Sequence, residues 1–444
     1  MEDQLQQVIR EKILLAAESP VPKLTRRDVA FPLIAGKAAA VIGMRRAGKT
    51  TFLHQIRGDL MAGGRSAEGL VYFNFEDERL GSFEAGSLHE IPEMHARLFP
   101  EAAKGKVTLF LDEIQRVPGW EVFVRRMLDT PEYELFLSGS SAKLLSREIA
   151  TSMRGRAWEI EIYPFSFAEF LRHHGHEMPE DPRQLTSRKA TEMDHYFGEF
   201  LTIGGFPEAQ GLNVADRRQL LQGYVDVLLL RDVIERHEVA NPTALRWMVR
   251  RLLGSPAGLF SVTKFATDLK SQGIAAGRET LYELLGHMED AFLLSAVTVA
   301  TDSEKRRQVN PRKVYPADTG LIPVFDRSGK ANTGHALETA VFIELQRRGA
   351  EVAYVKTPGG FEVDFLATYR DGTKDLIQVC ANPDDPATLT REIRALEDAA
   401  PAFPKAGQLL LTLEFRLPFP EVPKPARILP AWQWMLMGEN HSAA

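Results

Sequence analysis

A glycine-rich segment with one lysine and one threonine has the residue types and the spacing to bind phosphate. Residues 43–50 read Gly-Met-Arg-Arg-Ala-Gly-Lys-Thr, which matches G-x-x-x-x-G-K-[ST]. Glycines let a backbone wrap around phosphate with its N–H groups pointing inward, and the start of a helix adds a favourable dipole. Lys49 would reach the β and γ phosphates, and the Thr50 hydroxyl would complete the coordination shell of Mg²⁺. The segment therefore predicts a site for ATP and Mg²⁺; a glycine-containing turn without a ligand is the alternative. The expected lining residues are Gly43, Arg45, Arg46, Ala47, Gly48, Lys49, Thr50 and Thr51.

Two adjacent carboxylates follow an apolar run later in the chain. Residues 107–111 read Val-Thr-Leu-Phe-Leu and lead into Asp112 and Glu113. One carboxylate would hold Mg²⁺, and the other would position or deprotonate the attacking water. Many strands end in acidic loops, so this pair gains its meaning from the phosphate-binding segment before it. Together the two motifs predict ATP hydrolysis, with Asp112 in the metal shell and Glu113 as a catalytic residue.

Two serines follow the next apolar run. Ser138 and Ser140 come directly after residues 134–137, Glu-Leu-Phe-Leu. Their hydroxyls could contact the γ phosphate or the attacking water, or they could only cap a turn, which a Ser-Gly-Ser-Ser segment suits equally well.

These motifs require a sheet that brings them to one edge. Apolar runs at residues 38–42, 69–75, 107–112, 134–138 and 158–163 are separated by stretches with helical character, and a further helix is expected over residues 3–17. Strands that alternate with helices form a parallel sheet covered on both faces, and ligands bind beyond the carboxyl ends of its strands. Each motif lies at such an end.

Several segments together resemble one known family, the prokaryotic AAA+-type ATPases that carry a C-terminal domain of unknown function. The resemblance rests on Met44-Arg-Arg, Asp112-Glu-Ile-Gln, Leu137-Ser-Gly-Ser-Ser, Met153-Arg-Gly-Arg and Tyr163-Pro-Phe-Ser-Phe-Ala-Glu-Phe. It implies ATP binding and hydrolysis, a homo-oligomer that is often a ring, a downstream winged-helix module and a nuclease-like tail. In such assemblies an arginine of one protomer reaches the γ phosphate bound by its neighbour. Arg154 and Arg156 are the candidates for this role, with bridging of acidic surface as the alternative.

The expected architecture has four parts. A P-loop AAA+-type α/β domain with a parallel sheet covers residues 1–170, and a helical lid covers residues 171–240. A winged helix-turn-helix covers residues 241–330, and a restriction-endonuclease-like α/β domain of the PD-(D/E)xK type covers residues 331–444. His173, His174 and His176 lie at the first boundary, where a solvated loop is expected, because adjacent histidines rarely share one ion.

The third part carries the charge that could meet DNA. Residues 243–315 contain eleven Lys and Arg against seven Asp and Glu, although the whole chain has a net charge of −6. The basic residues expected to contact DNA phosphate lie in a polar hairpin, the wing: Lys305, Arg306, Arg307, Arg312 and Lys313. The expected reading helix carries Glu279, Glu283 and Glu289, so recognition of phosphate is favoured over recognition of bases. A winged helix that binds protein is the alternative.

The tail resembles a PD-(D/E)xK nuclease that lacks two of its catalytic residues. Glu338 and Asp364 match the helix carboxylate and the strand aspartate of a PD-(D/E)xK site. The following acid-x-lysine pair is absent, because Gln378 and Cys380 stand at its two positions. A neutral amide and a thiol are poor ligands for Mg²⁺. We therefore expect no cleavage of DNA, with Glu338 and Asp364 serving as salt-bridging or capping residues.

Composition sets the remaining limits. With 44% hydrophobic and 26% charged residues and one cysteine, the chain has the profile of a globular protein of a reducing compartment, and the sequence predicts neither a membrane span nor a signal segment. A cytoplasmic location is expected. The leading prediction is an oligomeric ATP-driven motor that remodels or translocates on duplex or branched DNA. The alternative is a nucleotide-dependent signalling or defence switch whose winged helix and tail bind protein.

Overall fold

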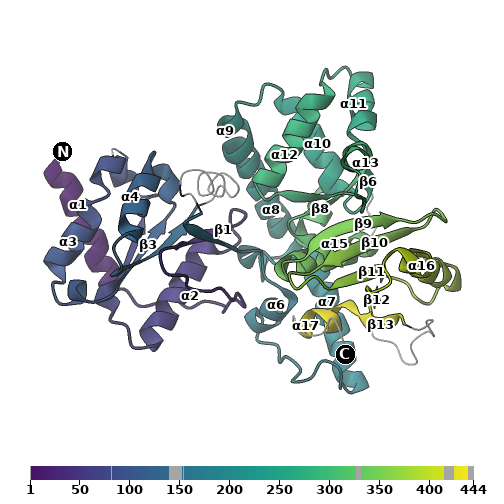
Figure 1. Cartoon of the computed structure of the whole chain (residues 1–444), viewed down its shortest axis with the longest axis horizontal. Coiled ribbons are helices and arrows are strands. Elements are labelled where there is room, and N and C mark those ends of the chain that lie inside the picture. The colour runs from purple at the N-terminus through teal and green to yellow at the C-terminus, as the bar shows by residue number, and fades with distance from the viewer. Residues whose placement is uncertain are drawn as a thin grey trace. The chain divides into compact units, whose positions relative to one another are not determined.

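A computed structural model covers the whole chain and describes residues 2–81, 83–139, 153, 155–326, 332–414 and 425–438. The chain divides into two compact units, Met1–Tyr163 and Pro164–Ala444. Figure 1 follows the chain through both units by colour. Among the described residues, no helix combines the length and the apolar character needed to cross a bilayer.

The first unit is built on a five-stranded sheet. Its strands are β1 (Ala38–Ile42), β2 (Leu70–Asn74), β3 (Val107–Asp112), β4 (Tyr133–Ser138) and β5 (Ala157–Glu161). Their spatial order is β2-β3-β4-β1-β5, and all neighbours are parallel. Strands β1 and β3 are buried along their whole length, which explains why their sequences are continuous apolar runs. The predicted parallel α/β sheet is confirmed.

Helices cover this sheet on both sides. They are α1 (Glu2–Glu18), α2 (Lys49–Ala62), α3 (Glu90–Leu98) and α4 (Trp120–Leu128), with short 3₁₀ turns η1 (Ala67–Gly69), η2 (Glu78–Leu80), η3 (Ala85–Ser87), η4 (Ala102–Lys104) and η5 (Ile114–Arg116). Figure 1 shows α2 and α4 on opposite sides of the strands. The phosphate-binding loop follows β1 directly. Because β1 lies between β4 and β5, the loop begins at an inner position of the sheet.

The second unit begins with helices. They are α6 (Phe167–His173), α7 (Ser187–Ile203), η6 (Pro207–Ala209), α8 (Val214–Leu228), the π-helical segment η7 (Leu229–Ile234) and α9 (Glu235–His237). Ser166 and Glu169 form a capping box at the start of α6, which fixes where this helix begins after the sheet of the first unit. The structure contains helices within the predicted lid region, and the domain boundaries at residues 170, 240 and 330 stay predictions.

Residues 204–205 pack closely against residues 318–320. The N–H groups of Gly205 and Gly320 donate to the Asp318 carboxylate at 2.7 and 2.9 Å. A Cβ atom on Gly205 would lie 2.3 Å from the carbonyl oxygen of Phe165, so a larger residue does not fit there. Burial raises the pKa of Asp318 to about 7, although the two backbone N–H groups act in the opposite direction.

Three helices and a small sheet follow. The elements are α10 (Pro242–Gly254), β6 (Leu259–Phe260), α11 (Val262–Ser271), α12 (Arg278–Asp290), β7 (Leu294–Val297), α13 (Glu304–Val309) and β8 (Arg312–Pro316). The sheet is antiparallel in the order β6-β8-β7. The sequence predicts a polar hairpin between β7 and β8, but the connection contains the short helix α13, because the Ser303 side chain accepts from the backbone N–H of Arg306 and starts a helical turn. The turn η8 (Thr319–Leu321) and α14 (Ile322–Phe325) lead onward.

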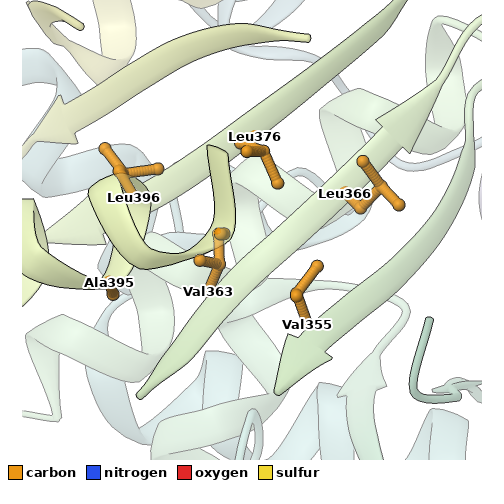
Figure 2. Packing of buried hydrophobic residues seen from close by; sticks show 7 residues of the cluster. Val355, Val363, Leu366, Leu376, Ala395 and Leu396 are labelled. Carbon is orange, nitrogen blue, oxygen red and sulfur yellow. The ribbon is translucent and has the colours of Figure 1, made fainter. Parts of the chain in front are cut away.

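A second five-stranded sheet forms the end of the chain. Its strands are β9 (Glu351–Lys356), β10 (Glu362–Thr368), β11 (Lys374–Cys380), β12 (Gly407–Thr412) and β13 (Arg427–Pro430), in the order β13-β12-β11-β10-β9. Strands β9 to β11 are antiparallel, and β11 to β13 are parallel. The associated helices are α15 (Thr333–Arg347), α16 (Pro386–Ala399), η9 (Ala400–Ala402) and α17 (Ala431–Leu436). Figure 2 shows how α16 packs on β9 to β11 through Val355, Val363, Leu366, Leu376, Ala395 and Leu396, joined by Ala399.

Candidate functional site

The phosphate-binding loop has the backbone that its glycines predict. Gly43 has φ 138°, and a Cβ atom there would lie 2.2 Å from the carbonyl oxygen of Ile162. Gly48, with φ 102°, is the N-cap of α2. Both conformations are unfavourable for residues with side chains. The loop can therefore turn sharply from β1 into α2 and direct the first turn of the helix toward a bound anion.

The ammonium group of Lys49 lies within the loop. Its Nζ atom donates to the carbonyl oxygens of Gly43 and Met44, both at 3.0 Å, and the residue is only 6% exposed. The charge is thus held against the loop backbone, where a phosphate group would compete with these carbonyl oxygens. The contact of Lys49 with the β and γ phosphates stays a prediction.

Thr50 and Asp112 meet although they come from different motifs. The Thr50 hydroxyl donates to Asp112 Oδ2 at 2.9 Å. Asp112 is fully buried, and it also accepts from the Tyr72 hydroxyl at 2.6 Å and from the Ser138 hydroxyl. Ser138 is itself fully buried. Hard oxygen atoms from Thr50 and Asp112 are the ligand type that Mg²⁺ prefers, so these two residues fit the predicted metal shell.

Ser138 connects the two acids. Its hydroxyl donates to Asp112 and accepts from the backbone N–H of Glu113 at 3.2 Å. The sequence predicts contact with phosphate or water, or capping of a turn, and these roles stay predictions. In the structure Ser138 is placed to position Asp112 and the backbone of Glu113. Ser140, the second serine, lies outside the described residues.

Glu113 sits in an unusual backbone conformation. Its φ is 58°, in the left-handed region that residues with side chains rarely adopt, and Gln115 donates to its carboxylate. Such conformations persist where the surroundings determine them, and they concentrate at functional sites. The conformation turns the chain sharply directly after Asp112, the last residue of β3.

Two aromatic side chains beside Asp112 do not stand out in the sequence. The ring of His54 on α2 lies against Tyr72 on β2, with ring centres 4.5 Å apart. Burial, and then the charge of Asp112, raise the pKa of Tyr72 well above its ordinary value. Burial lowers the pKa of His54. The raised pKa favours the protonated Tyr72 hydroxyl, which donates to Asp112.

Arg27 also escapes the sequence motifs. It is 3% exposed, and its guanidinium donates to the carbonyl oxygens of Ala47 in the loop, at 2.9 Å, and of Tyr163 beyond β5. The Gln55 side chain on α2 holds the backbone of Arg27 through two hydrogen bonds, at 2.7 and 3.0 Å. Arg27 thus fixes the phosphate-binding loop relative to the last residue of the first unit. Arg27 lies 16 positions before Gly43, in the polar segment Arg26-Arg27-Asp28. No periodic pattern in this segment would reveal its role.

Arg156 lies far from the loop of its own chain. It directly precedes β5, and its carbonyl accepts from the N–H of Ala38 at the start of β1. It is therefore at the amino ends of the strands, while the loop is at their carboxyl ends. Its side chain pairs with Asp129 at 2.5 Å. Arg154, the other candidate for contact with a neighbour's phosphate, lies outside the described residues.

The five basic residues predicted to contact DNA phosphate differ in their exposure. Lys305, Arg306 and Arg307 are exposed on α13, while Arg312 is half-buried beside the ring of Tyr282. Lys313 is 3% exposed, so its prediction as a phosphate contact is wrong. Arg312 and Lys313 differ in exposure because they are adjacent on β8, and adjacent residues of a strand face opposite sides.

Lys313 instead lies among carboxylates of the tail. Its Nζ atom is 3.0 Å from Glu338, 2.9 Å from Glu362 and 2.8 Å from Asp364. Burial alone would lower the pKa of Lys313, but Asp364, Glu338 and Glu362 raise it above its ordinary value. Burial and then the charge of Asp364 raise the pKa of Glu338, while Lys313 and the Tyr315 hydroxyl act in the opposite direction. The predicted salt-bridging role of Glu338 and Asp364 is confirmed, with a lysine that the sequence assigned elsewhere.

Gln378 and Cys380 are buried at the end of β11. The Gln378 side chain accepts from the N–H of Asp364 at 3.1 Å and donates to Glu392 at 2.6 Å. Cys380 is 2% exposed, and burial raises the pKa of its thiol to about 11.

Two family models match successive segments of the chain. A family model described as AAA domain matches residues 35–171, and one described as Domain of unknown function (DUF8612) matches residues 194–330. An uncharacterized protein of Methanocaldococcus jannaschii is 36% identical over 399 residues, which cover 89% of this chain and 85% of that protein. An uncharacterized protein of Haemophilus influenzae is 30% identical over 333 residues, which cover 74% of this chain and 79% of that protein.

Two solved structures share weaker similarity. The Walker-type ATPase of Pyrococcus abyssi is 14% identical, with a TM-score of 0.40 over 72% of this chain and 95% of that chain. Cdc6p from Pyrobaculum aerophilum is 14% identical, with a TM-score of 0.25 over 72% of this chain and 90% of that chain. The family assignment rests on the sequence relatives, on the AAA-domain match and on the loop geometry. The chain belongs to the same family as the M. jannaschii and H. influenzae proteins, and its residues 35–171 form an AAA-type domain with a phosphate-binding loop.

Proposed function

We propose that the chain binds ATP together with Mg²⁺ and hydrolyses ATP at the phosphate-binding loop. The observation that carries this proposal is the hydrogen-bonded series Thr50, Asp112, Ser138 and Glu113, which joins the loop to the end of β3. A loop that served only as a turn would not need a buried carboxylate and a second acid arranged around its threonine.

Each residue of the site has a separate role in binding or hydrolysing ATP. Lys49 neutralises charge on the β and γ phosphates, and backbone N–H groups of the loop hold the phosphate chain. Thr50 and Asp112 would hold Mg²⁺, which supplies charge neutralisation on the phosphates when bound. Glu113 orients and deprotonates the attacking water.

We further propose that the active form is a homo-oligomer. Arg156 is at the edge of the sheet opposite its own loop, so it could meet a nucleotide only in another protomer. Its pairing with Asp129 is at the surface, with Arg156 45% exposed, so the pair is weak enough to exchange for a phosphate contact. Arg154 stays a candidate for the same role.

DNA is the proposed target of the second unit. The three helices and the β7–β8 pair have the element order of a winged helix-turn-helix, and the exposed residues of α13 present three adjacent positive charges. Such a cluster suits phosphate, because charge contacts of this kind carry no base information. ATP hydrolysis would then drive remodelling of, or translocation on, duplex or branched DNA.

A protein target is the second candidate, and one observation favours it. The burial of Lys313 removes one of the five predicted phosphate contacts. The exposed face of α12 presents Glu279, Tyr282 and Glu283, two acids that DNA would repel around an aromatic ring that suits a protein surface. In this case the chain is a nucleotide-dependent switch.

The rate of ATP hydrolysis, measured with and without DNA across a salt series, separates the two candidates. For a DNA target we expect stimulation that weakens as salt rises. Changing Lys305, Arg306 and Arg307 to Glu should abolish the stimulation and reduce the slope of log affinity against log salt by up to roughly 3, since each duplex phosphate contact contributes about 0.9. The matched control changes three exposed basic residues of the first unit, Arg10, Lys23 and Lys104, to Glu. Rates that ignore DNA would favour the protein target.

A further inference from the structure

The second unit holds one lysine that is surrounded by acids and shielded from solvent. Lys313 Nζ lies between 2.8 and 3.0 Å from one oxygen each of Glu338, Glu362 and Asp364. An ammonium group has three N–H donors, and here three carboxylates surround it. The lysine is 3% exposed, so water does not replace any of these partners readily.

The acids and the lysine come from different parts of the chain. Glu338 is on α15, and Glu362 and Asp364 are on β10, so the carboxylates belong to the C-terminal sheet and its helix. Lys313 is on β8, the middle strand of the preceding three-stranded sheet. The cluster is therefore also a connection between these two parts of the second unit.

Tyr315 forms a second connection between β8 and α15. It lies two residues after Lys313 and therefore on the same face of β8. Its hydroxyl donates to Glu338 Oε1 at 2.8 Å, and its ring stacks on Phe342 of α15 with ring centres 4.3 Å apart. One strand thus supplies a cation, a hydrogen-bond donor and an apolar surface to the same helix.

The remaining polar atoms around Asp364 are also engaged. Asp364 Oδ2 accepts from the backbone N–H of Val379 at 3.0 Å. Gln378 bridges the N–H of Asp364 to the carboxylate of Glu392 on α16. These bonds hold Asp364 in place without a metal ion.

The arrangement does not fit the Mg²⁺ ion that a PD-(D/E)xK site holds. Mg²⁺ needs near-octahedral oxygen ligands at about 2.1 Å. The oxygens of Glu338 and Asp364 that would serve are both in contact with a positive charge, and a second cation there would be repelled by it. The third ligand position is occupied by the amide of Gln378.

We propose that Lys313 is a resident cation that takes the place of a divalent metal in the tail and fastens β8 to the C-terminal sheet. The three carboxylates, which repel one another, are compatible with folding because this ammonium group lies among them. Removing the ammonium while keeping the acids leaves an oxygen-rich, negatively charged site, and such a site attracts a divalent cation. The lysine thus excludes a metal that the carboxylates alone would bind.

The test is a titration of the nucleotide-free full chain with Mn²⁺, followed by electron paramagnetic resonance of the free ion. Lys313→Met should gain one Mn²⁺ site at least about tenfold tighter than any site of the parental chain, because only carboxylate oxygens then line the cluster. The additional change Asp364→Asn should remove this site. Lys374→Met is the matched control, since Lys374 is exposed on the same sheet, and it should behave as the parental chain does.

Thermal unfolding keeps the test decisive if Lys313→Met folds poorly. Mn²⁺ should raise the Tm of Lys313→Met by more than it raises that of the parental chain. The triple variant Lys313→Met, Glu338→Gln, Asp364→Asn should be more stable than Lys313→Met in EDTA, since it has fewer unpaired carboxylates.

Three results would overturn the proposal. A parental chain that binds Mn²⁺ as tightly as Lys313→Met, with binding lost in Asp364→Asn, would show that the lysine and a metal coexist. A folded Lys313→Met chain without a new site would show that the acids do not need a cation. A triple variant no more stable than Lys313→Met would show the same.

Discussion

The Thr50 hydroxyl lies 2.9 Å from Asp112 Oδ2, which joins the first turn of α2 to the last residue of β3 across 62 positions of the chain. The same carboxylate accepts from Tyr72 and Ser138. Two motifs that the sequence presents separately thus form one site, and Asp112 is its centre.

Ser138→Ala is expected to slow ATP hydrolysis about 10- to 100-fold, the usual effect of losing a residue that orients a metal ligand. Asp112 and the N–H of Glu113 would both lose a buried partner. ATP affinity should change little, because Ser138 does not belong to the phosphate-binding loop. Steady-state kinetics with a separate measurement of nucleotide binding checks this split. Equal losses in binding and turnover would contradict the positioning role.

Lys49→Ala is expected to weaken ATP binding by at least about 100-fold, since the main cation against the phosphates is removed. Lys23→Ala, at an exposed position of the same unit, is the control and should bind ATP normally. Fluorescence titration with a labelled ATP analogue measures both. Normal binding by Lys49→Ala would exclude the loop as the nucleotide site.

Arg27→Ala is expected to lower the free energy of unfolding of the first unit by roughly 2–4 kcal/mol, because it leaves buried carbonyl oxygens of Ala47 and Tyr163 without their charged donor. ATP affinity should fall as well, since Ala47 belongs to the loop. The neighbouring Arg26 offers a matched control, because its pair with Asp59 is 58% and 49% exposed and should contribute at most about 1 kcal/mol. Urea unfolding of both variants makes the comparison. Similar losses for the two arginines would argue against the role of Arg27.

The stability of the second unit should depend on pH through Asp318. Its pKa is about 7 in the fold and about 3.9 in an unfolded chain, so between these values the folded state holds one proton more. This contribution to stability is fully present below pH 4 and is lost as the pH rises through 7. The slope is at most about 1.4 kcal/mol per pH unit.

Asp318→Asn should flatten this dependence between pH 5 and 8, as measured by urea midpoints. Asp268→Asn, at an exposed position of α11, is the control and should keep the parental slope. A slope for Asp318→Asn equal to the parental slope would mean that Asp318 does not titrate in this range.

The sequence predicts the first unit well because its signals are local. Gly43, Gly48 and Lys49 act through neighbouring backbone atoms, and the apolar runs of β1 and β3 reflect burial on both faces. Arg27 and Tyr72 escape prediction because their roles arise only when separate segments meet. No spacing rule links a residue before the motif, or one on the neighbouring strand, to the loop or to Asp112.

Lys313 shows the same limit in the second unit. A cluster of five basic residues reads as one charged surface, yet the strand places Lys313 opposite Arg312. Its acidic partners follow it by 25 to 51 positions, so their proximity depends on how β8 packs against α15 and β10. The missing acid and lysine at Gln378 and Cys380 were visible in the sequence, whereas the replacement cation was not.

The most direct measurement of the central claim compares ATP binding and ATP turnover in the parental chain and in Glu113→Gln. The amide keeps the shape of the side chain but cannot accept the proton of the attacking water. Glu113→Gln should bind ATP as the parental chain does and hydrolyse it at least about 100-fold more slowly. Hydrolysis at the parental rate would contradict the assignment of Glu113, and with it the account of this site as the place where ATP is cleaved.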